Sequence, residues 1–263
     1  GFALESFAEN LEKQILPYLA PLMAKLVELL MTGSLKVQET AIAAISSAAS
    51  AVIMAASAGD VEIEVFHPYV EQIMPVFKQI MTTETPEVFQ LRARATECSG
   101  IVTQCYEKAQ AAQMIAELMP YVYSGIHLDS SELREFSYAF FANAAEVLGA
   151  GFAQYLPKTM EAVYTTMMND DIVWGDSEED EIEGGANPLE GIELGSDDSD
   201  DEGGGGKMFS VRTAQLEEKA SACQCVGTLA EHVGEAYAPY LEQSTQLLYD
   251  LADYFHEEVR GAV

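Results

Sequence analysis

Residues 17–30 read PYLAPLMAKLVELL, and this stretch sets the pattern for the whole chain. It opens with proline and tyrosine and continues with large apolar residues three and four positions apart, the spacing of one helix face. Proline suits the first helical turn, because the N–H that it lacks would have no partner there. We therefore predict a helix with one buried face, formed by Leu19, Leu22, Met23, Leu26, Leu29 and Leu30.

Two kinds of helix start alternate along the sequence. The first kind combines proline and tyrosine, as Pro-Tyr-apolar at Tyr69 and Tyr240 and as Tyr-Leu-Pro at Tyr155. The interval from Tyr69 to Tyr155 is 86 residues, or two repeats of 43, and a two-helix period of this length is typical of HEAT and armadillo repeats. The second kind is an apolar residue followed by arginine or glutamine: Val37-Gln38, Leu91-Arg92, Leu133-Arg134, Val211-Arg212 and Val259-Arg260.

The predicted fold class is all-α, an α-solenoid of HEAT repeats built from antiparallel helix pairs, with a long acidic disordered loop. Helix ends are expected at Gly33, Gly149 and Gly234, and caps at Thr85 and Asp129, the latter paired with Glu132. Both ends lack a partner helix, so we expect an internal fragment of a longer chain. The predicted units are the end of a truncated repeat (1–14), repeats at 15–60, 61–110, 111–150 and 151–236, the last carrying an acidic insertion at 169–206, and the start of a truncated repeat (237–263).

Negative charge dominates the composition. The chain has 13 basic and 43 acidic residues, a net charge of −30. Nucleic-acid binding needs lysine and arginine to displace counterions from phosphates, so this balance argues against it. A field of this sign instead attracts basic proteins and raises their association rates.

The acidic insertion carries half of the excess charge, with 15 acidic and no basic residues. Like charges repel and little apolar surface is available, so a mobile loop is expected. It is either a solubilising spacer or an electrostatic tether for lysine- and arginine-rich partners. Trp174 is either a ring on which a cation rests, worth about 0.5–2 kcal/mol, or a plug that packs onto the helices.

Cysteine usage and hydropathy point to a helical core. The four cysteines lie in apolar helical stretches without CxxC spacing, so we expect reduced, buried thiols. Thr40 to Gly59 is uncharged for 20 residues, long enough to cross a bilayer. It is mostly alanine and serine, which favours a buried solenoid helix over a membrane span.

Motifs for catalysis or cofactor binding do not fit. The glycine run before Lys207 lacks the serine or threonine of a phosphate loop, because Met208 follows. A calcium loop beginning at Asp198 would have Phe209 in place of its bidentate glutamate. The histidines have no zinc spacing. We therefore predict no enzymatic activity, no cofactor and no metal.

Several segments together resemble the importin-β (karyopherin-β) family of nuclear transport receptors. They are residues 3–11 (ALESFAENL), 91–98 (LRARATEC), 211–223 (VRTAQLEEKASAC) and 255–260 (FHEEVR). An acidic insertion within a repeat points to the importin-four and importin-five branch. The resemblance implies a receptor that carries basic cargo, such as ribosomal proteins or histones, and shuttles between cytoplasm and nucleus.

The resemblance also implies where cargo binds, because second helices line the concave surface in this family. It assigns nucleoporin and Ran-GTP binding to the full-length parent, with no nucleic-acid or membrane partner and a monomeric state. A HEAT scaffold or a histone-chaperone-like protein without transport activity is the alternative. The candidate cargo-binding residues are Glu39, Glu97, Glu132, Glu135, Glu217 and Glu218 on second helices, with Trp174, Asp176, Glu178, Glu179, Asp180, Glu181, Asp197, Asp198, Asp200 and Asp201 in the loop.

Overall fold

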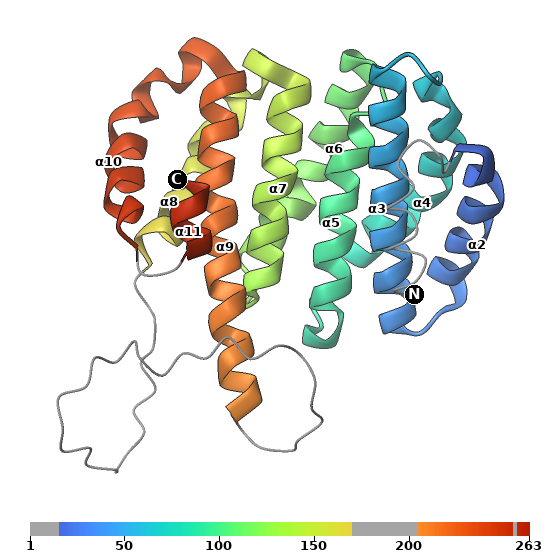
Figure 1. Cartoon of the computed structure of the whole chain (residues 1–263), viewed down its shortest axis with the longest axis horizontal. Coiled ribbons are helices and arrows are strands. Elements are labelled where there is room, and N and C mark those ends of the chain that lie inside the picture. The colour runs from blue at the N-terminus through green and yellow to red at the C-terminus, as the bar shows by residue number, and fades with distance from the viewer. Residues whose placement is uncertain (1–15, 170–204, 255–256) are drawn as a thin grey trace.

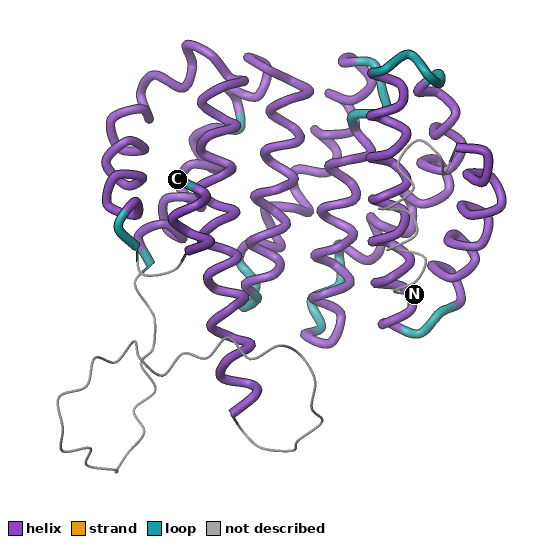
Figure 2. The backbone as a smooth tube through the Cα atoms, viewed as in Figure 1, coloured by secondary structure: helices purple, strands orange, loops and turns teal. Residues whose placement is uncertain are grey.

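The computed structural model describes residues 16–169, 205–254 and 257–263, and within these residues every regular element is a helix (Figures 1 and 2). The helices form two layers. The second helix of each pair belongs to the row that faces the viewer in Figure 1, and the first helices lie behind or beside it. The predicted all-α solenoid is therefore confirmed.

The helices follow one another in pairs, and the connections that lie wholly within the described residues are turns or short 3₁₀ helices. The 3₁₀ helices span Ile63–Phe66, Pro86–Val88, Gly149–Gln154 and Gly234–Tyr240. The pairs are α2 (Leu19–Thr32) with α3 (Leu35–Ser57), α4 (His67–Met81) with α5 (Phe89–Thr103), α6 (Lys108–Ile126) with α7 (Ser131–Leu148), α8 (Leu156–Met168) with α9 (Gly205–Val233), and α10 (Leu241–Ala252) with α11 (Glu257–Ala262).

The layer of second helices is the more tightly packed of the two. Each of the second helices α3, α5, α7 and α9 packs extensively against the next one in this series. Neighbouring first helices make far fewer contacts with each other. A curved stack has its elements closer together on the inner side, so the second helices form that side. One continuous apolar core lies between the layers and includes Leu26, Phe77, Phe140 and Met160.

Helix α3 contains the uncharged stretch that was weighed as a membrane span. Among the described residues it is the one helix long and apolar enough to cross a bilayer, and 61% of its most apolar window is buried inside the protein. A core helix of a soluble protein passes the same test. Ala44, Ile45, Ala48 and Val52 of this helix are fully buried, as expected for an interior helix.

The arginine or glutamine that marks a second helix has a structural role in four of the five described pairs. In α3, α5, α7 and α11 it is the fourth residue of the helix, and its side chain donates to a backbone carbonyl at or just beyond the end of the preceding first helix. Cations near a helix C-terminus satisfy orphan carbonyls and interact favourably with its dipole. We call these side chains clasps: Gln38 to Leu30, Arg92 to Thr83, Arg134 to Leu128, and Arg260 to Tyr254.

Some local expectations were wrong by a few residues. The cap of α7 is Ser130, whose hydroxyl accepts from the Leu133 N–H, and not Asp129. Thr85 precedes a 3₁₀ turn and makes no side-chain cap. Helix α9 begins at Gly205 and not near Val211, so the helix extends into the predicted insertion.

The four cysteines are free and buried, as expected. Burial raises the pKa of the Cys98 and Cys105 thiols to about 12, so both are protonated at neutral pH.

Candidate functional site

Three consecutive second helices bring glutamates together on the inner layer. Glu97 lies on α5, Glu132 and Glu135 lie on α7, and Glu217 lies on α9. Burial, followed by the charges of Glu217 and Glu97, raises the pKa of Glu135 to about 7; Arg94 opposes this shift and Glu132 adds to it. We call Glu97, Glu132, Glu135 and Glu217 the acidic cluster.

The acidic cluster already holds one cation of the chain itself. The Arg94 guanidinium lies 3.4 Å from a carboxylate oxygen of Glu97 and 4.8 Å from the centre of the Phe136 ring. The surface thus offers a cation both carboxylate and aromatic contacts. Arg94 is paired with Glu97, and a surface where several carboxylates gather attracts a basic partner. The sequence analysis did not single out Arg94 or Phe136, although Arg94 lies one helical turn before Glu97.

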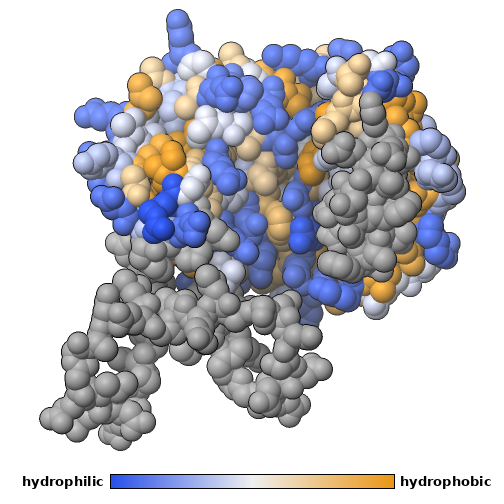
Figure 3. Space-filling view, viewed as in Figure 1, coloured by the Kyte–Doolittle hydropathy of each residue, from blue (hydrophilic) through white to orange (hydrophobic). Residues whose placement is uncertain are grey.

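An amide group extends the polar character of this surface along α5 and α7. Gln104, two turns after Glu97, donates through Nε2 to Asn143 Oδ1 at 2.7 Å and to Glu146 Oε2 at 3.3 Å. In Figure 3 hydrophilic side chains occur over much of this face, with apolar areas among them. The second-helix layer therefore presents polar groups along two adjacent helices as well as the acidic cluster.

Glu39 and Glu132 have local partners. Glu39 lies on α3, is 11% exposed at its side chain and lies 3.3 Å from the Lys36 ammonium. Glu132 accepts from the Ser130 hydroxyl at 3.0 Å, at the start of α7. Glu39 is therefore more enclosed than Glu217, which is exposed.

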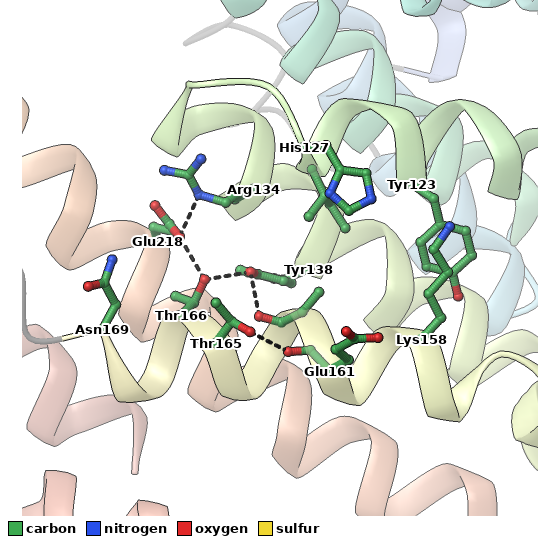
Figure 4. Close-up of a pocket in the computed structure, with 12 residues that line it drawn as sticks. Tyr123, His127, Arg134, Tyr138, Lys158, Glu161, Thr165, Thr166, Asn169 and Glu218 are labelled. Atoms are coloured by element: carbon green, nitrogen blue, oxygen red, sulfur yellow. Dashed lines mark hydrogen bonds and ion pairs between the residues drawn. The ribbon is translucent and has the colours of Figure 1, made fainter.

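Glu218 does not fit the expectation that it faces cargo. It is buried, and its Oε1 accepts from Arg134 Nε at 2.8 Å and from the Thr166 hydroxyl at 2.7 Å (Figure 4). Tyr138 completes this network by a 2.6 Å hydrogen bond to Thr166 and one of 3.2 Å to the Ala162 carbonyl. Glu218 is a structural ion-pair partner that joins α7, α8 and α9.

The Glu218 network forms part of the wall of a pocket of about 400 Å³, which lies between α6, α7, α8 and α9 (Figure 4). Lys158 lies 4.2 Å from the centre of the Tyr123 ring, and Glu161 and His127 also line the pocket. Arg134 and Glu218 form an ion pair. Lys158 and Glu161 carry opposite charges, so their net charge is zero. This pocket lacks the excess of negative charge that a basic partner requires.

The predicted loop residues lie outside the described part of the chain: Trp174, Asp176, Glu178, Glu179, Asp180, Glu181, Asp197, Asp198, Asp200 and Asp201. Among the described residues, no group of three or more His, Cys, Asp or Glu side chains is arranged to hold a metal ion.

Comparison with known proteins adds to this geometry. No protein-family model matches the sequence. The chain is 29% identical over 265 residues to the probable importin subunit beta-4 of Schizosaccharomyces pombe, covering 98% of this chain and 23% of the relative. It is 24% identical over 266 residues to importin subunit beta-3 of Saccharomyces cerevisiae, covering 99% of this chain and 23% of the relative.

Solved structures share the fold. The crystal structure of Kap121p bound to Pho4p superposes with a TM-score of 0.68 at 20% identity, over 99% of this chain and 23% of that chain. Kap121p bound to Nup53p gives a TM-score of 0.66 at 20% identity, with the same coverage. A variant of Kap121p with three acidic residues replaced by lysine gives a TM-score of 0.68 at 21% identity, again with the same coverage.

The paired helices and their packing define a HEAT-repeat solenoid. The chain is similar to members of the importin-β (karyopherin-β) family, and the relatives that it matches point to the importin-four and importin-five branch. This is a family of transport receptors and not of enzymes, in agreement with the sequence-based expectation. The chain spans about a quarter of the length of the curated relatives that it matches.

Proposed function

We propose that this chain is the part of a nuclear import receptor that binds lysine- and arginine-rich cargo segments, such as those of ribosomal proteins or histones. The observation that carries the proposal is the acidic cluster, where carboxylates from α5, α7 and α9 influence one another on the inner layer. An extended basic peptide that crosses these helices would meet a carboxylate from each of them.

Three further points support the proposal. The matched relatives are named as importins, and the Kap121p structures include complexes with Pho4p and Nup53p. The chain has 13 basic residues against 43 acidic ones, and of the basic ones Arg92 and Lys219 are buried and Arg134 is paired with Glu218. We assign nucleoporin and Ran-GTP binding, and shuttling between cytoplasm and nucleus, to the full-length receptor.

The proposal is tested by the affinity of a histone H3 tail peptide for the chain at low and high salt. The triple variant Glu97→Gln, Glu135→Gln, Glu217→Gln should bind about 10-fold more weakly at low salt, since each exposed ion pair is worth about 0.2–1 kcal/mol. The matched control neutralises three glutamates on first helices, Glu71, Glu161 and Glu242. Equal weakening by both triple variants would mean that net charge, and not the acidic cluster, holds the peptide.

The loop candidates are tested by deleting residues 170–202. If these residues tether basic partners, the deletion lowers the association rate most strongly at low salt, where charges are least screened. Unchanged binding after the deletion would remove the segment from the mechanism.

A transport carrier and a histone-chaperone-like protein differ in whether Ran-GTP makes them release the bound peptide. Ran-GTP added to the full-length receptor should release the peptide from a carrier, whereas a chaperone without transport activity would retain it.

A further inference from the structure

Helix α9 breaks the register that the other second helices share. In α3, α5, α7 and α11 the clasp is the fourth residue, but the fourth residue of α9 is Met208. The side chain that reaches the end of α8 is Lys219, the fifteenth residue of α9. The eleven extra residues correspond to about three turns, which returns to the same helix face and extends α9 by about 16 Å. Figure 1 shows the beginning of α9 below the ends of its neighbours.

Lys219 makes the contacts of a clasp at the residue where α8 gives way to the acidic segment 170–204. Its ammonium donates to the Asn169 carbonyl at 2.7 Å and to the Met167 carbonyl at 3.2 Å. The side chain is almost fully buried, so this charge–carbonyl contact is protected from water.

Lys219 also contacts the next helix pair. Its ammonium lies 4.9 Å from the centre of the Tyr254 ring, and the Tyr254 carbonyl accepts from Arg260, the clasp of that pair. Arg92 and Arg134 bridge in the same way, from the end of their own first helix to the following pair through Tyr121 and Glu218. The clasps therefore form a series along the solenoid. In α9 Lys219 takes the role that the fourth residue has in the other second helices, because α9 begins about three turns earlier.

We propose that Lys219 is a positioning residue that fixes the end of α8, the point to which segment 170–204 is attached in the sequence, and ties this end to the following helix pair. Lys219 and the two residues before it in α9 make different contacts. Glu217 belongs to the acidic cluster, Glu218 binds Arg134 and Thr166, and Lys219 holds the carbonyl of Asn169. Glu217 and Lys219 are two residues apart and lie on opposite sides of α9, so α9 links the acidic cluster to the end of α8.

A functional consequence follows if the proposed function is right. A charged tether acts through its effective concentration at the site, which depends on where it is attached. A fixed end of α8 would hold the attachment point of the segment at one place on the solenoid, whereas a frayed end of α8 would spread the acidic residues over a larger volume.

The first test measures local opening by hydrogen exchange and does not depend on cargo. Lys219→Met keeps the length and apolar stem of the side chain but removes its charge and donors. Exchange of the amides in residues 165–169 should become about 10-fold faster, because a hydrogen bond from a charged donor is lost. Rates in α5 should stay within about twofold of the parent chain, since α5 does not touch this contact.

Two controls separate the contact from charge and folding. Lys219→Arg retains a cationic donor and should stay near the parent rates, and Lys158→Met removes an exposed cation of α8 that touches no carbonyl of this turn. If Lys219→Met proves too unstable, Lys219→Gln, a shorter neutral donor, should give a smaller local increase. Unchanged rates at 165–169 in Lys219→Met, or an equal increase throughout the chain, would overturn the proposal.

The second test combines Lys219→Met with deletion of residues 170–202 and measures peptide affinity. Lys219→Met should weaken binding about threefold in the full chain and have no effect in the deletion, since a positioning residue acts only through the segment. An equal effect in both backgrounds would contradict the positioning role. If the deletion alone leaves affinity unchanged, the tether hypothesis fails while the exchange result still decides the role of Lys219.

Discussion

Glu217 and Glu218 are adjacent in the sequence, yet they lie in two different regions of the molecule. Glu217 is exposed in the acidic cluster, where it raises the pKa of Glu135. Glu218 is buried between helices, where Arg134 and Thr166 compensate its charge. One helical step of about 100° therefore separates an exposed carboxylate from a buried one that joins three helices.

The largest expected effect comes from breaking the compensated region. Glu218→Ala leaves the Arg134 guanidinium without its carboxylate, and removing one partner of a buried ion pair costs about 3–5 kcal/mol. Arg134 is 25% exposed at its side chain and recovers some hydration, so we expect a loss near 3 kcal/mol in the free energy of unfolding. Urea denaturation measures it. Glu217→Ala is the control. An equal loss in the free energy of unfolding of this variant would show that the buried and the exposed glutamate do not differ in their effect on stability.

The second effect is a pH dependence of stability from the acidic cluster. The folded state raises the pKa of Glu135 from 4.5 to about 7, so between these values the folded chain binds more protons than the unfolded chain. The contribution of Glu135 to the free energy of unfolding is therefore present at low pH and is lost as the pH rises from about 4.5 to about 7. Glu135 is partly exposed, and solvent screens its interactions, so we expect the free energy of unfolding to fall by about 1.5 kcal/mol over this pH range.

Glu135→Gln removes this titration and provides the comparison. The difference in unfolding free energy between the variant and the parent chain should grow in favour of the variant from pH 5 to pH 8. A difference that is constant over this range would show that Glu135 titrates normally.

A third effect is on peptide binding. A lysine-rich peptide without histidine keeps its charge between pH 6 and pH 8, whereas Glu135 ionises over this range. Affinity should rise about 5-fold from pH 6 to pH 8, because the ionised carboxylate binds a cation better. Calorimetry in buffers of different ionisation enthalpy should show proton release at pH 7. Glu135→Gln should lack both signals, and their persistence in this variant would place the titrating group elsewhere.

The smallest effect concerns the internal cation. Arg94→Met removes the guanidinium that contacts Glu97 and Phe136, so a cation of the partner no longer competes with Arg94 for these two groups. We expect peptide affinity to increase about twofold, the size of one exposed ion pair. Arg94→Lys keeps the charge and should change affinity less. A loss of affinity in Arg94→Met would mean that Arg94 positions the glutamates instead of competing with the peptide.

The sequence predicted the fold well because its signals are local and repeated. Apolar residues such as Leu26 and Leu30 follow helical spacing, and the arginine or glutamine near the start of α3, α5, α7 and α11 marks a contact with the first helix of the same pair. Residues such as Arg92 act over the short distance between two helices of one pair, so sequence position alone locates them.

The site was less predictable because it depends on helix rotation and register. The sequence placed Glu217 and Glu218 together as cargo contacts, and only the position of Arg134 and Thr166 separates them. Lys219 could not be recognised as a clasp, because the shift of α9 by about three turns has no local signature.

The central claim is that basic peptides bind at the acidic cluster of the inner layer. The most direct measurement is carbodiimide cross-linking of a lysine-rich peptide to the chain, with the modified carboxylates identified by mass spectrometry. The account predicts cross-links at Glu97, Glu135 and Glu217 that disappear at high salt. Cross-links confined to first-helix carboxylates such as Glu71, Glu161 and Glu242 would contradict it.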